Sequence, residues 1–203
     1  MAEVMAMLHY KEADLVRALA RVAVRLRVAF AAACAERLLP AYEDFCKRAR
    51  RGDQTALSGI LKRVWEHLLS QEMTAEQIRT ELNRCMALIP GEDDEPWVDE
   101  QAYAEDAASA VAYTLRALES REPQEAAWAA RRAYEAADHY VTHRIGIEGE
   151  LQVLAHPIVQ AELARQRRDL DELRWAGQEP TGLIDRLRDR ARTEASTFFG
   201  LKS

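Results

Sequence analysis

The stretch FAAACAERLLPAYEDFC, residues 30–46, combines small and apolar residues with a glutamate, an arginine and a proline. If it forms one straight helix, Cys34 and Cys46 lie about 18 Å apart, too far to share a metal or form a disulfide. A second cysteine or histidine two to four residues away, which structural zinc sites use, accompanies neither thiol. The stretch therefore predicts a core helix with buried cysteines, and Pro40 predicts a kink or a helix boundary in it.

Apolar residues recur at intervals of three and four along most of the chain, which is the spacing of one helix face. The first stripe consists of Leu15, Leu19, Val22, Leu26, Ala29 and Ala33. Later stripes begin at Leu57, Ile78 and Ala104, and others cover residues 134–145, 159–173 and 183–191. Eight glycines and six prolines leave these segments long, and no strand alternation is found. We predict an all-α fold, a single-domain bundle of about seven or eight helices over residues 1–203.

Residues that cap or break helices mark several helix ends. Thr74, followed by Gln77, has the pattern of a capping box. Asp53 or Thr55 is a candidate N-cap for the predicted helix whose apolar stripe begins at Leu57. His156 and Pro157 are the expected N-cap and first residue of a later helix, because the first turn needs no backbone N–H from proline.

The net charge of −6 is unevenly distributed: residues 1–63 carry +5, residues 64–156 carry −12 and residues 157–203 carry +1. Such an acidic block argues against a general nucleic-acid binder, which would show a basic stripe. No apolar stretch approaches the ~18 residues that a membrane span needs. Three cysteines cannot all pair with one another, which favours a reduced environment. We expect a cytoplasmic protein that binds neither nucleic acid nor membrane.

The opening stretch, with Gly52–Asp53 and ILKRVWEHL at residues 60–68, resembles the bacterial YjaG-like family, the domain of unknown function 416. The matching motif positions are Cys34, Glu36, Arg37, Pro40, Tyr42, Phe45, Cys46, Trp65 and Glu66. The resemblance continues at IPGEDDEP, HPIVQAEL and IDRLRDRARTEASTFFGL, so it covers most of the chain. It implies an all-helical, bacterial, cytosolic protein, and it implies no activity.

Glu36 and Arg37 are charged residues beside the predicted core face of their helix. Such a pair most often closes a salt bridge to a neighbouring helix, and a ligand site is the alternative. Cys34 could act as a nucleophile only if its thiol pKa were lowered, and Arg37 is the nearby residue that would lower it.

His139 and His143 lie one helical turn apart, and Glu135 lies one turn earlier, so the three share a face that could chelate a metal. The histidines are about 200° round the helix from Ala137 and Val141, which predicts an outer face in water. A metal site needs three or four converging ligands, so we expect none here. Glu-x-x-His, His-Glu-x-x-His and glycine-rich phosphate motifs are absent from the sequence, and we expect no cofactor.

The stretch GEDDEPWVDE, residues 91–100, is the densest part of the acidic block. Its acids suit the positive N-terminal end of the next predicted helix, and it lacks the ligand order of a calcium loop. The simplest interpretation is a solvated loop. The functional alternative is an acidic docking surface with an apolar anchor, formed by Asp93, Asp94, Glu95, Trp97, Asp99 and Glu100.

Two functions follow. The first is a non-enzymatic module that binds a protein partner, as an adaptor or as an inhibitor of a basic protein, or that binds itself as a homodimer. The second is a small enzyme or metal-dependent protein that uses the Cys34–Glu36–Arg37 region or the His139–His143 face. The missing catalytic motifs and the charge asymmetry favour the first.

Overall fold

The structure, a computed structural model, describes residues 7–91, 100–175 and 182–198. Within those ranges it contains helices and no strand, so the all-α prediction is confirmed. The α-helices, and one π-helix labelled η1, are α1 Glu12–Leu19, α2 Val24–Ala49, α3 Ala56–Leu69, α4 Ala75–Met86, α5 Gln101–Ser120, α6 Pro123–His139, η1 Tyr140–Ile145, α7 Glu150–Ala155, α8 Pro157–Trp175 and α9 Leu183–Ala195.

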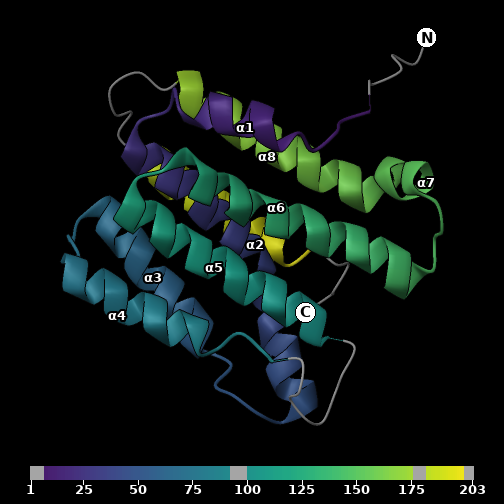
Figure 1. The fold of residues 1–203 in the computed structure, drawn as a ribbon, viewed down its shortest axis with the longest axis horizontal. Helices are drawn as coiled ribbons and strands as arrows, with labels where there is room; N and C mark the ends of the chain where they lie inside the picture. Colours follow the sequence, from purple (N-terminus) through teal and green to yellow (C-terminus); the bar gives the residue numbers. More distant parts are fainter. Residues whose placement is uncertain (1–6, 92–99, 176–181, 199–203) are drawn as a thin grey trace.

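Helix α2 lies in the middle of the bundle, with α5 and α6 on one side of it and α9 on the other (Figure 1). It is buried over most of its length, and Phe30 and Cys34 are completely covered. Alanines dominate the faces of α5 and α6 that pack together, which lets their backbones approach closely. One hydrophobic core runs through the helices, so the chain forms a single bundle.

The predicted stripe from Leu15 to Ala33 is divided between two helices, which corrects our expectation of one continuous face. α1 ends at Leu19 and α2 begins at Val24. The buried Arg27 side chain donates to the carbonyl oxygens of Leu19 and Val22 at 3.1 Å, and to that of Arg121 at 2.6 Å. Arg27 thus satisfies the carbonyl groups that the break exposes, an arrangement that apolar spacing does not reveal.

Pro40 lies inside α2, so of the two expected alternatives, a kink or a helix boundary, the boundary is wrong. Proline has no N–H to offer the carbonyl of Glu36 one turn earlier, and an interior proline costs about 3 kcal/mol or more. Helix formation around Pro40 is favoured by packing, because the residues on both sides, including Leu38 and Tyr42, are buried. The Cys34–Cys46 segment is therefore one helix, as the opening stretch predicts.

The predicted helix ends agree with the structure. Thr74 and Gln77 form the complete capping box of α4. Thr55 is the N-cap position of α3, and Asp53 accepts hydrogen bonds at 2.8 Å from the Thr55 N–H and hydroxyl. Pro157 begins α8, and His156 Nδ1 accepts a hydrogen bond from the N–H of Ile158 at 3.3 Å.

Within the described ranges, every helix is too short or too polar to cross a membrane.

Candidate functional site

Arg37 of α2 is completely buried and is surrounded by carboxylates from two distant helices. Its Nε and Nη2 donate to the two carboxylate oxygens of Glu162 at 3.1 and 3.0 Å. Its Nη1 donates to Asp169 Oδ2 at 2.9 Å and lies 3.6 Å from Glu194 Oε2. Burial by itself lowers the pKa of Arg37, but Glu162 and Asp169 raise it above its ordinary value, so the guanidinium stays charged.

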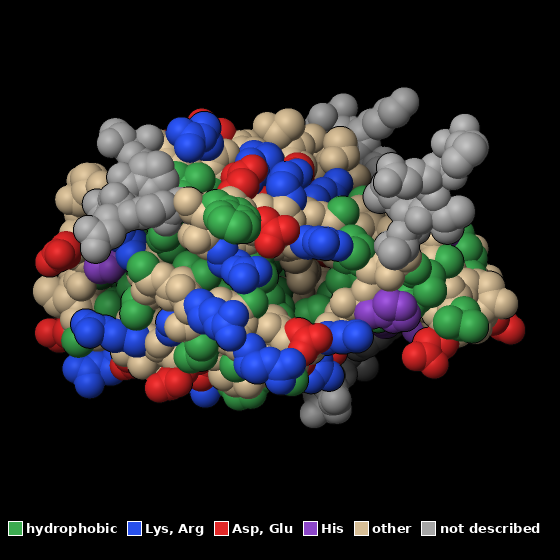
Figure 2. All heavy atoms as spheres, turned by 90° about the horizontal axis from the view of Figure 1, so that it is seen from above, with side chains coloured by type: hydrophobic (Ala, Val, Ile, Leu, Met, Phe, Trp, Pro, Cys, Tyr) green, Lys and Arg blue, Asp and Glu red, His purple; other side chains and the backbone are tan. Residues whose placement is uncertain are grey.

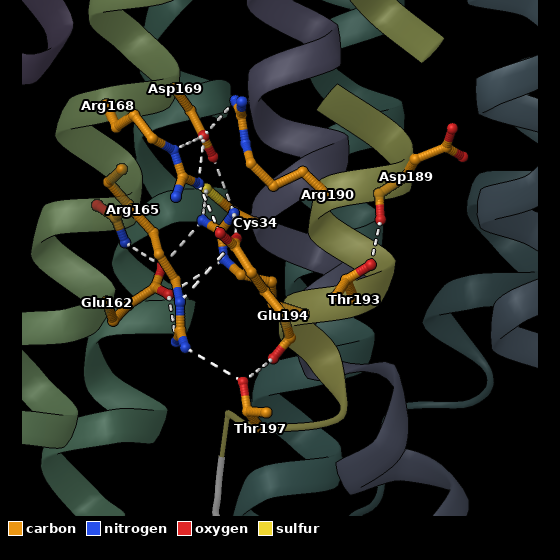
Figure 3. A network of polar contacts seen from close by, with 12 residues as sticks. Cys34, Glu162, Arg165, Arg168, Asp169, Asp189, Arg190, Thr193, Glu194 and Thr197 are labelled. Atoms are coloured by element: carbon orange, nitrogen blue, oxygen red, sulfur yellow. Dashed lines mark hydrogen bonds and ion pairs between the residues drawn. The ribbon is translucent and has the colours of Figure 1, made fainter. Parts of the chain in front are cut away.

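A second layer of arginines neutralises these carboxylates toward the surface (Figure 3). Asp169 Oδ1 accepts from Arg168 and Arg190, each at 2.8 Å. Arg168 also lies 2.7 Å from Glu194, and Arg165 lies 3.8 Å from Glu162. The completely buried charges of Arg37, Glu162 and Asp169 are thus paired and hydrogen-bonded, which is the condition for tolerating them inside a protein.

Glu36, the residue before Arg37, makes a second link between helices. Its Oε2 accepts a 2.7 Å hydrogen bond from Nε1 of Trp65 on α3, and its Oε1 pairs with Arg192 on α9 at 3.0 Å. Arg37 meets Glu194, two residues further along α9. We call Glu36, Arg37, Arg192 and Glu194 the α9 clasp, because their charges hold α9 against α2. The salt-bridge interpretation of Glu36 and Arg37 is confirmed.

The cysteine part of the motif is chemically unreactive in this setting. Cys34 is fully buried, and burial raises its thiol pKa even though Arg37 Nη2 donates to its sulfur at 3.4 Å. Cys46 and Cys85 are also free and buried, as predicted, and burial raises their pKa values too. A thiol that stays protonated in the core is a poor nucleophile and a poor metal ligand.

Tyr42 and Cys46 lie under the turn that follows α2. Tyr42 is buried, and its hydroxyl is a hydrogen-bond partner of the Cys46 thiol. Gly52 crosses directly above them with φ of 77°, and a Cβ there would stand 3.3 Å from the Cys46 sulfur. Glycine is thus needed both for the left-handed backbone and for the close approach. These motif positions shape a turn.

The two histidines of the predicted outer face differ in their surroundings. His143 is exposed, whereas His139 is half-buried against the ring of Tyr103, with ring centres 5.2 Å apart, which corrects the expectation that both lie in water. Burial and the neighbouring His143 lower the pKa of His139. Glu135 pairs with Arg131 and Arg132. In the part of the chain that the structure describes, no three metal-binding side chains converge.

Glu100 is the one member of the predicted acidic docking surface that falls within the described ranges. It precedes α5 and is paired with Arg48 at 3.2 Å and with Arg144 at 3.8 Å. The other members, Asp93, Asp94, Glu95, Trp97 and Asp99, lie outside the described residues.

A groove of about 640 Å³ is formed where the ends of four helices meet. These helix ends lie at the left of Figure 1. We call it the helix-end groove. It is formed by the beginnings of α2 and α4 and the ends of α3 and α5, and its lining residues include Val28, Leu68 and Ile78, which are buried. Its volume is in the range of pockets that bind ligands or peptide side chains.

The charged lining of this groove is only partly neutralised. Arg25 donates to the carbonyl oxygen of Leu68 at the end of α3. Glu72 and Glu119 are exposed, and neither has an ion-pair partner in residues 7–91, 100–175 or 182–198. The ends of α3 and α5 add partial negative charge from their last carbonyl groups. The groove therefore combines buried apolar residues with unpaired carboxylates.

Comparison with known proteins gives the family. The family model described as "Protein of unknown function (DUF416)" matches residues 15–202. The chain belongs to the DUF416 family. A crystal structure of a DUF416 family protein from Shewanella baltica OS155 superposes with a TM-score of 0.80, at 21% identity, over 93% of this chain and 98% of that one. This likeness shows the shared fold. No curated protein matches the chain significantly.

The DUF416 motif residues could be recognised in the sequence, but their partners could not. Glu162, Asp169 and Glu194 lie on charged, arginine-rich helices, where nothing local distinguishes them from solvated acids. A signal exists in retrospect, because Glu162 and Asp169 are seven residues apart and thus share the inner face of α8. The helix-end groove has no such signal, since its residues come from four separate segments.

Proposed function

We propose that this DUF416 protein is a non-enzymatic cytoplasmic module that binds a basic protein partner. The observation that carries the proposal is that some charged side chains of the protein are paired inside the fold and others are not. The motif charges Glu36 and Arg37 form internal ion pairs, whereas Glu72 and Glu119, which line an open groove, have no ion-pair partner among the residues that the structure describes. Unpaired surface charge next to an accessible concavity favours binding over catalysis.

The acidic block supports a basic partner. Some of its charge is neutralised within the fold, since Arg48 pairs with Glu100 and Arg63 pairs with Glu81. The block holds 19 acidic and 7 basic residues, so an excess remains that these pairs do not remove. By contrast, the face that includes α1 and α8 shows charges of both signs side by side (Figure 2). A one-sided field steers a partner of opposite charge and accelerates its association.

The enzyme alternative has lost support from its own candidate residues. A nucleophilic Cys34 would need a lowered pKa, and burial raises it. The carboxylates of Glu162 and Asp169 around Arg37 are held by arginines, so neither of them is free to accept a proton from a substrate. His139 contacts the ring of Tyr103, and Glu135, the expected third ligand, is paired with Arg131.

Affinity capture from cells of the native host tests the proposal. One variant reverses four acids of the block, Asp93→Lys, Asp94→Lys, Glu95→Lys and Asp99→Lys. A matched control reverses four acids outside it, Asp14→Lys, Asp171→Lys, Asp185→Lys and Asp189→Lys, for the same change in net charge. We expect the wild type and the control to capture the same basic protein, and the first variant to lose it.

Two results would contradict the proposal. Equal capture by all three forms, at low and at physiological salt, would mean that the block is only a solvated surface. If sedimentation gives the mass of a dimer for the wild type and the mass of a monomer for the first variant, the block mediates self-association instead.

A further inference from the structure

The helix-end groove has the shape of a receptor for one apolar side chain flanked by polar groups. Val28, Leu68 and Ile78 are 0%, 1% and 7% exposed, so they belong to the core. Leu69, Met73 and Leu118, which also line the groove, are half-buried, and Val24 is 37% exposed. Methionine at such a position adapts to the shape of an inserted side chain. A leucine, methionine or phenylalanine of a partner would bury apolar surface here.

The lining contains two carboxylates, Glu72 and Glu119, that a cation next to that apolar side chain would pair with, beside the basic residues Arg25, His67 and Arg121. Glu72 and Glu119 come from the α3–α4 connection and from the end of α5, and both line the groove without an ion-pair partner in the described ranges. Arg25, the second residue of α2, directs its Nε and Nη2 to the Leu68 carbonyl oxygen. The N-terminal end of α4 also lines the groove. Its capping box already binds backbone N–H groups there, which reduces the attraction of this helix end for anions.

A peptide fits the lining better than a small ion does. Arg121 adds an exposed positive group to the two carboxylates, so the lining offers both signs of charge over a volume of about 640 Å³. A peptide supplies backbone carbonyl groups for Arg121 and a basic side chain for the carboxylates at the same time. A single inorganic ion would satisfy one sign and leave the apolar residues uncovered.

We propose that the helix-end groove binds a segment of a partner protein in which a large apolar residue lies next to a lysine or arginine. The apolar side chain occupies the space above Val28, Leu68 and Ile78, and the cation pairs with Glu72 and Glu119. This inference rests on the proposed function, because it identifies which part of a basic partner makes the contact.

A random 12-residue peptide library displayed on phage provides the probe. The library is selected on the immobilised full chain, and selected peptides are then synthesised and titrated by fluorescence anisotropy. We expect the selected sequences to be enriched in leucine, methionine or phenylalanine beside lysine or arginine. The Glu72→Lys/Glu119→Lys variant should bind these peptides at least ten-fold more weakly, and its own selection should yield acidic peptides instead.

Two further variants separate the groove from general effects. Val24→Arg, at a residue that is already 37% exposed, should obstruct the groove without disturbing the core, and should also weaken binding at least ten-fold. The control Glu148→Lys/Glu150→Lys makes the same charge change at exposed positions that do not line the groove, and should bind like wild type.

The proposal is overturned if no peptide class is enriched on the wild type, or if the selected peptides bind all variants equally. These results are distinct from failure of the proposed function. If wild type and Val24→Arg capture the same basic protein equally well from cells, the proposed binding function stands and the groove is not the contact. If cells yield no basic partner while groove-dependent peptides are selected, the acidic docking block is rejected and the groove is retained.

Discussion

Arg37 and Glu162 lie 125 positions apart in the sequence, yet their completely buried side chains are joined by two hydrogen bonds of 3.1 and 3.0 Å. This pair connects α2 to α8, and Asp169 and Glu194 extend the connection to a third helix, α9. The charged centre of this bundle therefore has a structural role, which leads to specific predictions.

Replacement of Arg37 by methionine should lower the free energy of unfolding by about 3–5 kcal/mol, because it removes both arginine hydrogen bonds of the buried Glu162 and leaves it Arg165, 3.8 Å away, as its cationic partner. Urea unfolding followed by circular dichroism measures the change. The double variant Arg37→Met/Glu162→Met should recover part of the loss, since Asp169 keeps Arg168 and Arg190 as partners. The control Arg17→Met, at an exposed pair with Asp14, should cost less than about 1 kcal/mol. If the double variant loses as much stability as Arg37→Met and Glu162→Met lose in sum, Arg37 and Glu162 are not coupled.

Weakening the α9 clasp should loosen α9 before the rest of the bundle. In Arg192→Met/Glu194→Gln, the two ends of the clasp on α9 lose their charges, so amide hydrogens of α9 should exchange roughly ten-fold faster. Hydrogen exchange with mass spectrometry measures this, with α6 as the internal reference. The matched variant Arg186→Met/Asp189→Asn removes two exposed charges of the same helix that lie outside the clasp, and it should leave the exchange rates unchanged. Equal acceleration in both variants would mean that the clasp does not hold α9.

The three thiols should be protected in the folded protein. Cys34, Cys46 and Cys85 are at most 3% exposed, and burial raises the pKa of each, so the reactive thiolate is scarce. Ellman's reagent at pH 8 should react slowly with the native chain and rapidly with three thiols in urea. Fast labelling of all three without denaturant would contradict this arrangement.

The contribution of Asp106 to the stability of the fold should decrease as the pH rises from about 4 to 7. Burial raises the pKa of Asp106 to about 7, although its bond with Arg132 at 3.2 Å lowers it somewhat. Between the unfolded pKa of about 4 and this value, the folded state binds more protons than the unfolded state, so raising the pH removes stability. As the pH rises across this range, the wild type should therefore lose up to about 4 kcal/mol of unfolding free energy relative to Asp106→Asn. A difference that does not change with pH would show that Asp106 ionises normally.

Local chemistry was sufficient to predict the helices and many of their ends. The spacing of Leu57, Val64 and Leu68 creates one apolar face whatever the rest of the chain does, and all three residues are buried in α3. The capping box of Thr74 and Gln77 closes within four residues, and Pro157 fixes the first turn of α8 by its own ring. These features depend on neighbours in sequence, so the sequence determined them.

The remaining features depend on groups that only folding brings together. The connection between α1 and α2 is stabilised by Arg27, which also donates a hydrogen bond to the carbonyl oxygen of Arg121, 94 positions away. Pro40 remains helical because the packing of α2 outweighs its local preference. Many acids could have paired with Arg37, and the packing of α8 and α9 against α2 selected Glu162, Asp169 and Glu194. Charge attraction is not specific to a partner, and side-chain spacing acts over one or two helical turns, so the tertiary structure alone decided the charged centre and the groove.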